Sequence, residues 1–128
     1  NFISIIEKRG KEIDIDPMKI EKNKANLLRT PIILAVICSP SVDSKIPKIE
    51  QILSCGALCM NILNNLLVKG WGANWLTGWM ANDKKFGELA FNNTKNEFVA
   101  GYIYVGSYEV MNPDRPRPSL DEKISYFK

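Results

Sequence analysis

Residues 47–70, PKIEQILSCGALCMNILNNLLVKG, decide the fold because they carry the longest helical periodicity in the chain. Proline suits the first turn of a helix, and glycine suits its end. One apolar face follows the i, i+3, i+4 spacing of a packed helix, through Ile49, Ile52, Leu53, Gly56, Ala57, Met60, Leu63 and Leu67. A second apolar face contains Cys55, Leu58, Cys59, Ile62 and Leu66. The pattern predicts a helix that is buried nearly all round.

The rest of the chain is too small to cover both faces of such a helix. With 128 residues, of which 45% are apolar, we expect a single domain with one core. The second apolar face then needs another subunit, or chain that precedes residue 1, to cover it. Dimerisation is the simpler of these two explanations.

Apolar stretches on either side of this helix predict the strands of a sheet. Residues 32–38 (IILAVIC) are bounded by prolines and suggest a central strand covered on both faces. Residues 98–106 (FVAGYIYVG) predict a second interior strand, and residues 70–77 contain a shorter one. The alternation of strands and helices is typical of an α/β domain (α+β in some schemes) with at least partly parallel strands.

Shorter helices are expected at three further places. An N-terminal amphipathic helix is expected to stop at Gly10, and a surface helix should follow Pro17. Asp83 can cap a helix that ends before Asn92. In the proline-rich arm at residues 107–128, Ser119 and Glu122 could form a capping box for one last turn.

Composition excludes several classes of function. The net charge of +3 comes without any block of like charges, which gives no argument for nucleic-acid binding. Histidine is absent, which excludes a Ser-His triad and a histidine-based zinc site in these residues. No stretch has about 18 uninterrupted apolar residues, and no signal peptide is visible, so we expect no membrane association. Three cysteines in apolar surroundings suit reduced thiols and a cytoplasmic location.

Two segments have a composition suited to a ligand. Residues 72–78 would follow a strand, where α/β sheets bind ligands, and they combine glycines with Trp75 and Thr77, which suits a flat aromatic cofactor. Arg115 and Arg117 lie in the proline-stiffened arm and could bind a phosphate or carboxylate. The alternatives are that the tryptophans only pack in the core and that the arm is a solvated basic tail. The carboxylates suggest no catalytic acid–base pair, and Cys55 and Cys59 suit small core residues better than a metal or redox site.

Residues 28–127 resemble the C-terminal part of the nitroreductase family of flavoproteins. The resemblance is carried by TPIILAVIC, SCGALCMNILNNLLVKGWG, NWLTG, and VAGYIYVG followed by PDRPRPSLDEKISYF, in that order. It implies a nitroreductase-like sheet flanked by helices, with the long helix at the interface of an intertwined homodimer. It further implies FMN as cofactor, NAD(P)H as co-substrate, and a two-step cycle that reduces nitroaromatic, quinone or similar electron-poor acceptors.

The resemblance also implies roles for particular residues. Trp75, Leu76 and Thr77 would contact the flavin, and Arg115 or Arg117 would hold its phosphate. The segment from Asn65 to Gly70 would border the nicotinamide site. Because the flavin performs the hydride chemistry, no residue of the chain is expected to act as catalytic acid or base.

Two features depart from the family pattern. Leu76 stands where related proteins often carry an arginine, and no Arg-Arg-Ser phosphate clasp precedes Leu28. The first residues, from Asn1, resemble the middle of a helix, so we expect that an N-terminal part of the domain is missing from residues 1–128. The alternative to an enzyme is a non-catalytic relative, either flavin-binding or a cofactor-free dimer.

Overall fold

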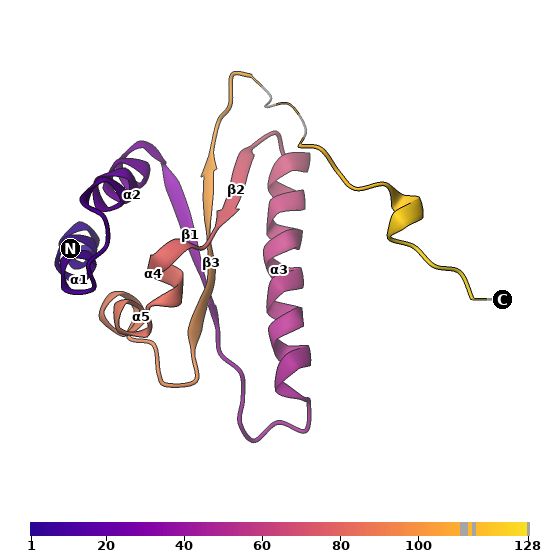
Figure 1. The fold of residues 1–128 in the computed structure, drawn as a ribbon, viewed down its shortest axis with the longest axis horizontal. Helices are drawn as coiled ribbons and strands as arrows, with labels where there is room; N and C mark the ends of the chain where they lie inside the picture. The colour runs from indigo at the N-terminus through magenta and orange to yellow at the C-terminus, as the bar shows by residue number, and fades with distance from the viewer. Residues whose placement is uncertain (111–112, 114, 128) are drawn as a thin grey trace.

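A three-stranded sheet forms the centre of the computed structural model, which describes residues 1–110, 113 and 115–127. The strands are β1 (Ile32–Cys38), β2 (Gly72–Leu76) and β3 (Phe98–Gly106), in the order β1-β3-β2. Both pairings are antiparallel. The expectation of at least partly parallel strands is therefore wrong for the strand pairings: β1 and β2 point the same way, but β3 lies between them (Figure 1).

The central strand is β3, as predicted, whereas the prediction of a central position for β1 is wrong. Within the described chain β1 forms an edge of the sheet, and Ile32 and Leu34 remain 56% and 40% exposed. An apolar run shows that a strand tends to be covered, but it does not show whether its own chain supplies the cover.

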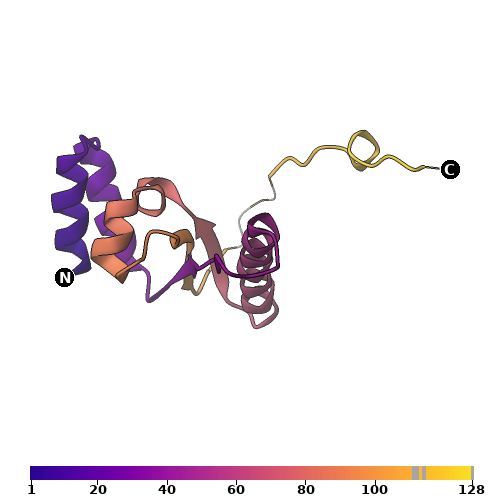
Figure 2. The ribbon, with the colours of Figure 1, turned by 90° about the horizontal axis from the view of Figure 1, so that it is seen from below.

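Four helices cover one face of the sheet (Figures 1 and 2). They are α1 (Phe2–Glu12), α2 (Pro17–Arg29), α4 (Gly78–Asn82) and α5 (Lys84–Phe91). The predicted Asp83 cap is confirmed, because its carboxylate accepts a hydrogen bond from the Phe86 N–H at 2.7 Å. The buried side chains of this layer are Ile6, Ile20, Met80, Phe86, Val99 and Tyr102.

Gly10 does not stop the first helix, so that prediction is wrong. Helix α1 continues to Glu12, and Gly10 is buried within it. A Cβ added at Gly10 would lie 2.8 Å from Cδ1 of Ile20. The glycine lets α1 and α2 approach closely, which is a packing role that the sequence alone does not distinguish from a cap.

Helix α3 (Lys48–Val68) lies alone on the opposite face of the sheet (Figure 1). The second apolar face of the sequence pattern meets the sheet, so the expectation that another subunit or missing chain covers it is wrong. Its Cys59, Ile62 and Leu66, with Leu63 of the first face, pack against Ile103 and Val105. The expected burial all round is wrong within this chain, because Leu53, Met60 and Leu67 are 64%, 53% and 58% exposed. By length and composition alone, α3 is also apolar enough to cross a membrane, a test that core helices of soluble proteins pass too.

Beyond β3 the chain leaves the sheet as an arm that extends past α3 (Figures 1 and 2). Its described residues include a single 3-10 turn at Leu120–Glu122. The expected capping box is wrong: Ser119 makes no side-chain cap bond, and the Glu122 N–H donates to the Ser119 carbonyl at 3.3 Å.

Candidate functional site

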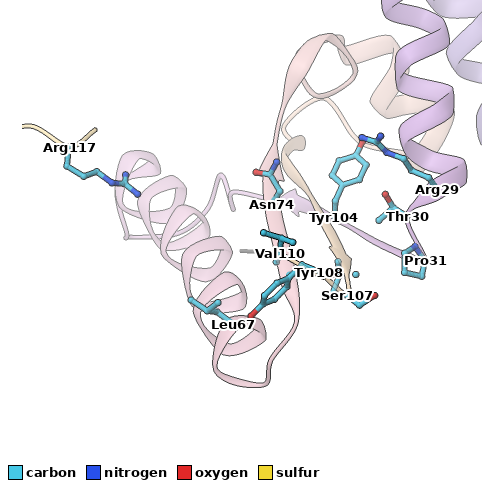
Figure 3. Close-up of a pocket in the computed structure, with 14 residues that line it drawn as sticks. Arg29, Thr30, Pro31, Leu67, Asn74, Tyr104, Ser107, Tyr108, Val110 and Arg117 are labelled. Carbon is cyan, nitrogen blue, oxygen red and sulfur yellow. The ribbon is translucent and has the colours of Figure 1, made fainter. Parts of the chain in front are cut away.

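A cavity of about 1020 Å³ opens at the end of the sheet where β1 and β2 begin and β3 finishes (Figure 3). Its volume reaches the upper range of pockets that hold cofactor-sized ligands. Two arginines, an amide, two hydroxyls and two phenols contribute polar groups: Arg29, Arg117, Asn74, Thr30, Ser107, Tyr104 and Tyr108. This donor set suits an anionic group carried on a flat aromatic body.

The end of α2 and the start of β1 position Arg29. Helix α2 ends at Arg29, and the backbone of Thr30 is extended. The Thr30 hydroxyl donates a hydrogen bond to the Asn26 carbonyl at 2.8 Å. Pro31 then leads into β1 and cannot continue the helix. The guanidinium of Arg29 is thereby held at the rim of the sheet, beside Tyr104 (Figure 3).

Strand register brings Tyr104 and Asn74 together. The two residues are direct partners in the β2–β3 ladder, and their side chains stand on the same face of the sheet (Figure 3). Burial raises the pKa of the Tyr104 phenol, because the charged form is disfavoured away from water. The phenol therefore keeps its proton at neutral pH and can donate a hydrogen bond into the cavity.

Tyr108 and Gly72 shape the opposite wall. A Cβ at Gly72 would lie 2.9 Å from Cδ1 of Tyr108 and 3.2 Å from the Gly106 carbonyl oxygen. The missing side chain allows the Tyr108 ring to pack directly on the β2 backbone. Leu67, near the end of α3, lines the same wall (Figure 3).

The predicted flavin contacts on β2 lie in different environments. The indole of Trp75 packs toward α3 and donates to the Ala100 carbonyl at 3.2 Å, in a notch that Gly101 provides. Leu76 is 43% exposed. Thr77 is exposed before α4 and lines a second cavity of about 330 Å³, which also contains Asn82.

The remaining predicted site residues lie at the end of α3 and on the arm. Asn65 is exposed and its amide donates to the Asn61 carbonyl at 2.8 Å, while Gly70 takes a positive φ of 80° at the turn into β2. Arg115 is exposed on the arm, and Arg117 lines the large cavity. Among the predicted residues, the single chain thus brings Arg117 to the large cavity and places Thr77 at a separate one.

Sequence reasoning missed Arg29 and Tyr104, and it included Asn74 only as part of the segment 72–78. Arg29 stands two residues before the proline that starts β1, and the other two lie inside strands. A basic residue at the junction of a helix and a strand was an available signal for Arg29. The side-by-side placement of Asn74 and Tyr104 depends on strand register, which no local pattern reveals. Among the described residues, no group of three cysteine or acidic side chains could hold a metal ion.

Comparison with known proteins supports one fold. No family model matches the chain. It is 24% identical over 131 aligned positions to the Escherichia coli K12 protein named "Putative NAD(P)H nitroreductase YdjA", covering 98% of this chain and 69% of that protein. A nitroreductase-like family protein from Bacillus cereus superposes with a TM-score of 0.78 at 17% identity, covering 98% of this chain and 66% of that structure. The predicted resemblance to the nitroreductase family is confirmed.

A second solved structure has the same nitroreductase-like fold. A BluB-like flavoprotein from Clostridium difficile 630 superposes with a TM-score of 0.63 at 18% identity, covering 99% of this chain and 73% of that one. The chain spans about two thirds of the length of the Escherichia coli and Bacillus cereus proteins described above. The mixed arrangement predicted from the sequence, with a sheet flanked by helices and one long helix, is the arrangement observed.

Proposed function

We propose that this chain belongs to an FMN-dependent NAD(P)H oxidoreductase that reduces nitroaromatic, quinone or similar electron-poor acceptors in a ping-pong cycle. The match of nearly the whole chain to a nitroreductase-like structure, at a TM-score of 0.78, carries the proposal. The name of the Escherichia coli relative and the flavoprotein description of the Clostridium difficile structure agree with it.

The residues of the large cavity suit FMN in their chemistry. Arg29 and Arg117 lie at opposite ends of the cavity, and either could offer a guanidinium group to a phosphate (Figure 3). Tyr104 and Tyr108 offer rings and hydroxyls for a flat aromatic body. A bound flavin supplies the hydride acceptor and donor of the reaction. The protein residues would bind and orient it, and Arg115 is proposed to assist from the arm.

The segment from Trp75 to Thr77 is proposed to border the flavin from the other end of β2. Gly78 follows at a positive φ of 70°, so the backbone of this turn takes a conformation that glycine favours. Exposed backbone at such a turn can approach a ligand closely. Asn65 and Gly70 are proposed to border the nicotinamide site.

A second copy of the chain is the proposed partner. The Thr77 turn and the Arg117 cavity are separate in one chain, so a common site would need residues of a neighbouring subunit. The exposed apolar face of α3 offers the surface for that contact. We propose a cytoplasmic homodimer that binds neither nucleic acid nor membrane.

The visible absorption spectrum of the purified full-length protein tests this proposal first. A yellow protein whose flavin bands bleach when NADH or NADPH is added anaerobically, and return when an acceptor is added, is the expected result. Parallel lines in double-reciprocal plots would identify the ping-pong cycle. A colourless protein that takes up no added FMN would contradict the proposal and favour the cofactor-free relative.

Charge-neutral variants of the arm test the role of its arginines. Arg117→Gln should raise the Kd for FMN about tenfold, because one charge-assisted hydrogen bond to the phosphate is lost. Lys123→Gln removes the same charge from an exposed position on the same arm and should leave the Kd unchanged. Equal effects of the two variants would show that the arm acts only through its overall charge.

A further inference from the structure

Cys38 ends β1 with its side chain toward α3. Side chains alternate along a strand, and Ile33, Ala35 and Ile37 pack on the helical layer, whereas Val36 packs on the α3 side. The bulge opposite Val36 and Ile37 does not disturb this alternation, because its extra residue belongs to β3. Cys38 therefore shares the α3 side with Val36, and it is only 4% exposed.

Two more cysteines face it from α3. Cys55 and Cys59 are one helical turn apart on the face that meets the sheet; Cys59 is fully buried and Cys55 is half-buried. Cys55 lies beside the Cys38 thiol, near enough to raise the pKa of Cys38. All three cysteines are reduced, and no three-ligand metal group occurs among the residues that the structure describes.

We infer that Cys38 and Cys55 form a dithiol pair that oxidises reversibly to an intramolecular disulfide between β1 and α3. The oxidant is a low-molecular-weight disulfide such as oxidised glutathione. The Cys55 thiolate attacks one glutathione sulfur, which forms a mixed disulfide and releases one glutathione thiolate. The Cys38 thiolate then attacks the Cys55 sulfur, which forms the protein disulfide and releases the second glutathione. Two protein thiols are oxidised and one glutathione disulfide is reduced, and the two protons that the protein thiols lose are taken up by the two departing glutathione thiolates.

Accessibility fixes the order of the two attacks. Cys55 is the less buried thiol and meets the oxidant first, whereas Cys38 is enclosed and acts as the resolving thiol. Burial, together with the neighbouring Cys55 and Cys59, raises the pKa of Cys38 to about 11, and nearby Lys48 partly opposes this shift. Since the thiolate is the nucleophile, the second step should accelerate as the pH rises toward that value.

Cys59 could compete with Cys38 for the bond to Cys55, but it is less suited to that reaction. It lies beneath α3 against Ile103 and Val105 with no exposed surface. A bond between Cys55 and Cys59 would need Cβ atoms about 3.8 Å apart, whereas Cβ atoms four residues apart on a helix are about 5–6 Å apart. The pairing should therefore be specific to Cys38 and Cys55.

Differential alkylation and peptide mapping test the inference on the full-length protein. The folded protein is incubated with oxidised glutathione, then unfolded and labelled with N-ethylmaleimide, which reacts with free thiols. Mass spectrometry then gives the number of labelled thiols. Labelling should fall by two thiols, without retained glutathione. Cleavage after Arg29, Lys45, Lys48 and Lys69 places Cys38 on peptide 30–45, and Cys55 with Cys59 on peptide 49–69. Fragmentation of the cross-linked peptides should assign the bond to Cys55.

Cysteine variants provide the controls. Cys59→Ala should keep the disulfide, with labelling again falling by two thiols. Cys38→Ala should stop at the mixed disulfide on Cys55, and Cys55→Ala should take up no glutathione at neutral pH. The wild-type fragmentation result stands even if a variant does not fold. Labelling that does not fall after oxidation, a bond through Cys59, or a lasting glutathione adduct in the wild type would overturn the inference.

Discussion

At the scale of single residues, Gly101 is the described glycine at which an added side chain would meet the closest neighbouring atom. A Cβ at Gly101 would lie 1.9 Å from Nε1 of Trp75 and 3.2 Å from the Leu76 carbonyl oxygen. The indole cannot move away freely, because it donates to the Ala100 carbonyl and packs on the α3 side. Gly101→Ala should therefore lower the free energy of unfolding by about 1–3 kcal/mol, as overpacking does. Urea unfolding followed by tryptophan fluorescence measures the change.

Gly56→Ala is the matched control for that substitution. Gly56 lies inside α3, and a Cβ there would meet nothing within 4 Å. Alanine is favoured over glycine in a helix interior by about 1 kcal/mol, so this variant should be more stable. Because Gly56 lies on the face proposed to contact a second copy, its unfolding is measured at protein concentrations at which the chain is monomeric. Two glycine-to-alanine changes with opposite signs would show that packing determines the first effect. A Gly101→Ala protein as stable as its parent would show that the notch does not hold Trp75 as described.

At the scale of elements, Asp83 joins α1 to the start of α5. Its two carboxylate oxygens accept from Nε and Nη2 of Arg9, both at 2.9 Å, and one of them also caps α5. Hydrogen bonding to Arg9 lowers the pKa of Asp83 below its ordinary value of 3.8. The carboxylate therefore stabilises the fold fully above about pH 4, and this contribution is lost as the pH falls through the lowered pKa.

Substitutions at Asp83 should separate the cap from the ion pair. Asp83→Ala removes both and should cost about 1–2 kcal/mol at neutral pH for the cap alone. Asp83→Asn keeps a cap acceptor, so it should lower the free energy of unfolding by less than Asp83→Ala. Because Asn has no carboxylate to protonate, the stability of this variant should fall less steeply below pH 4 than that of the parent. Thermal unfolding between pH 2.5 and 7 measures both variants. If the stability of Asp83→Asn fell below pH 4 as steeply as that of the parent, the ion pair of Asp83 with Arg9 would not be the cause of the decline.

Local patterns predicted the elements themselves but not how the chain arranges them. Residues 98–106 and the helix capped by Asp83 follow from alternation and capping, which act over a few residues. The edge position of β1, the antiparallel pairing and the role of Gly10 depend on contacts between distant segments. For the same reason the sequence indicated Arg117 but missed Tyr104 and its pairing with Asn74 in the ladder.

At the scale of the whole molecule, the outer face of α3 decides whether the protein works alone. The face carries Leu53 and Met60, two helical turns apart and 64% and 53% exposed. Burying such side chains in a dimer contributes about 1.5 kcal/mol or more each. Leu53→Glu combined with Met60→Glu should therefore raise the dimer Kd at least about a hundredfold.

Sedimentation equilibrium of the full-length protein measures this change. The parent should have twice the mass of one chain, and the double variant should have the mass of one. Leu28→Glu, at a 74% exposed position on α2, is the control and should leave the mass unchanged. Circular dichroism should show the same helix content in all three proteins, since none of these side chains belongs to the buried core. A parent that is already monomeric, or a double variant that stays dimeric, would mean that α3 is covered by something other than a second copy.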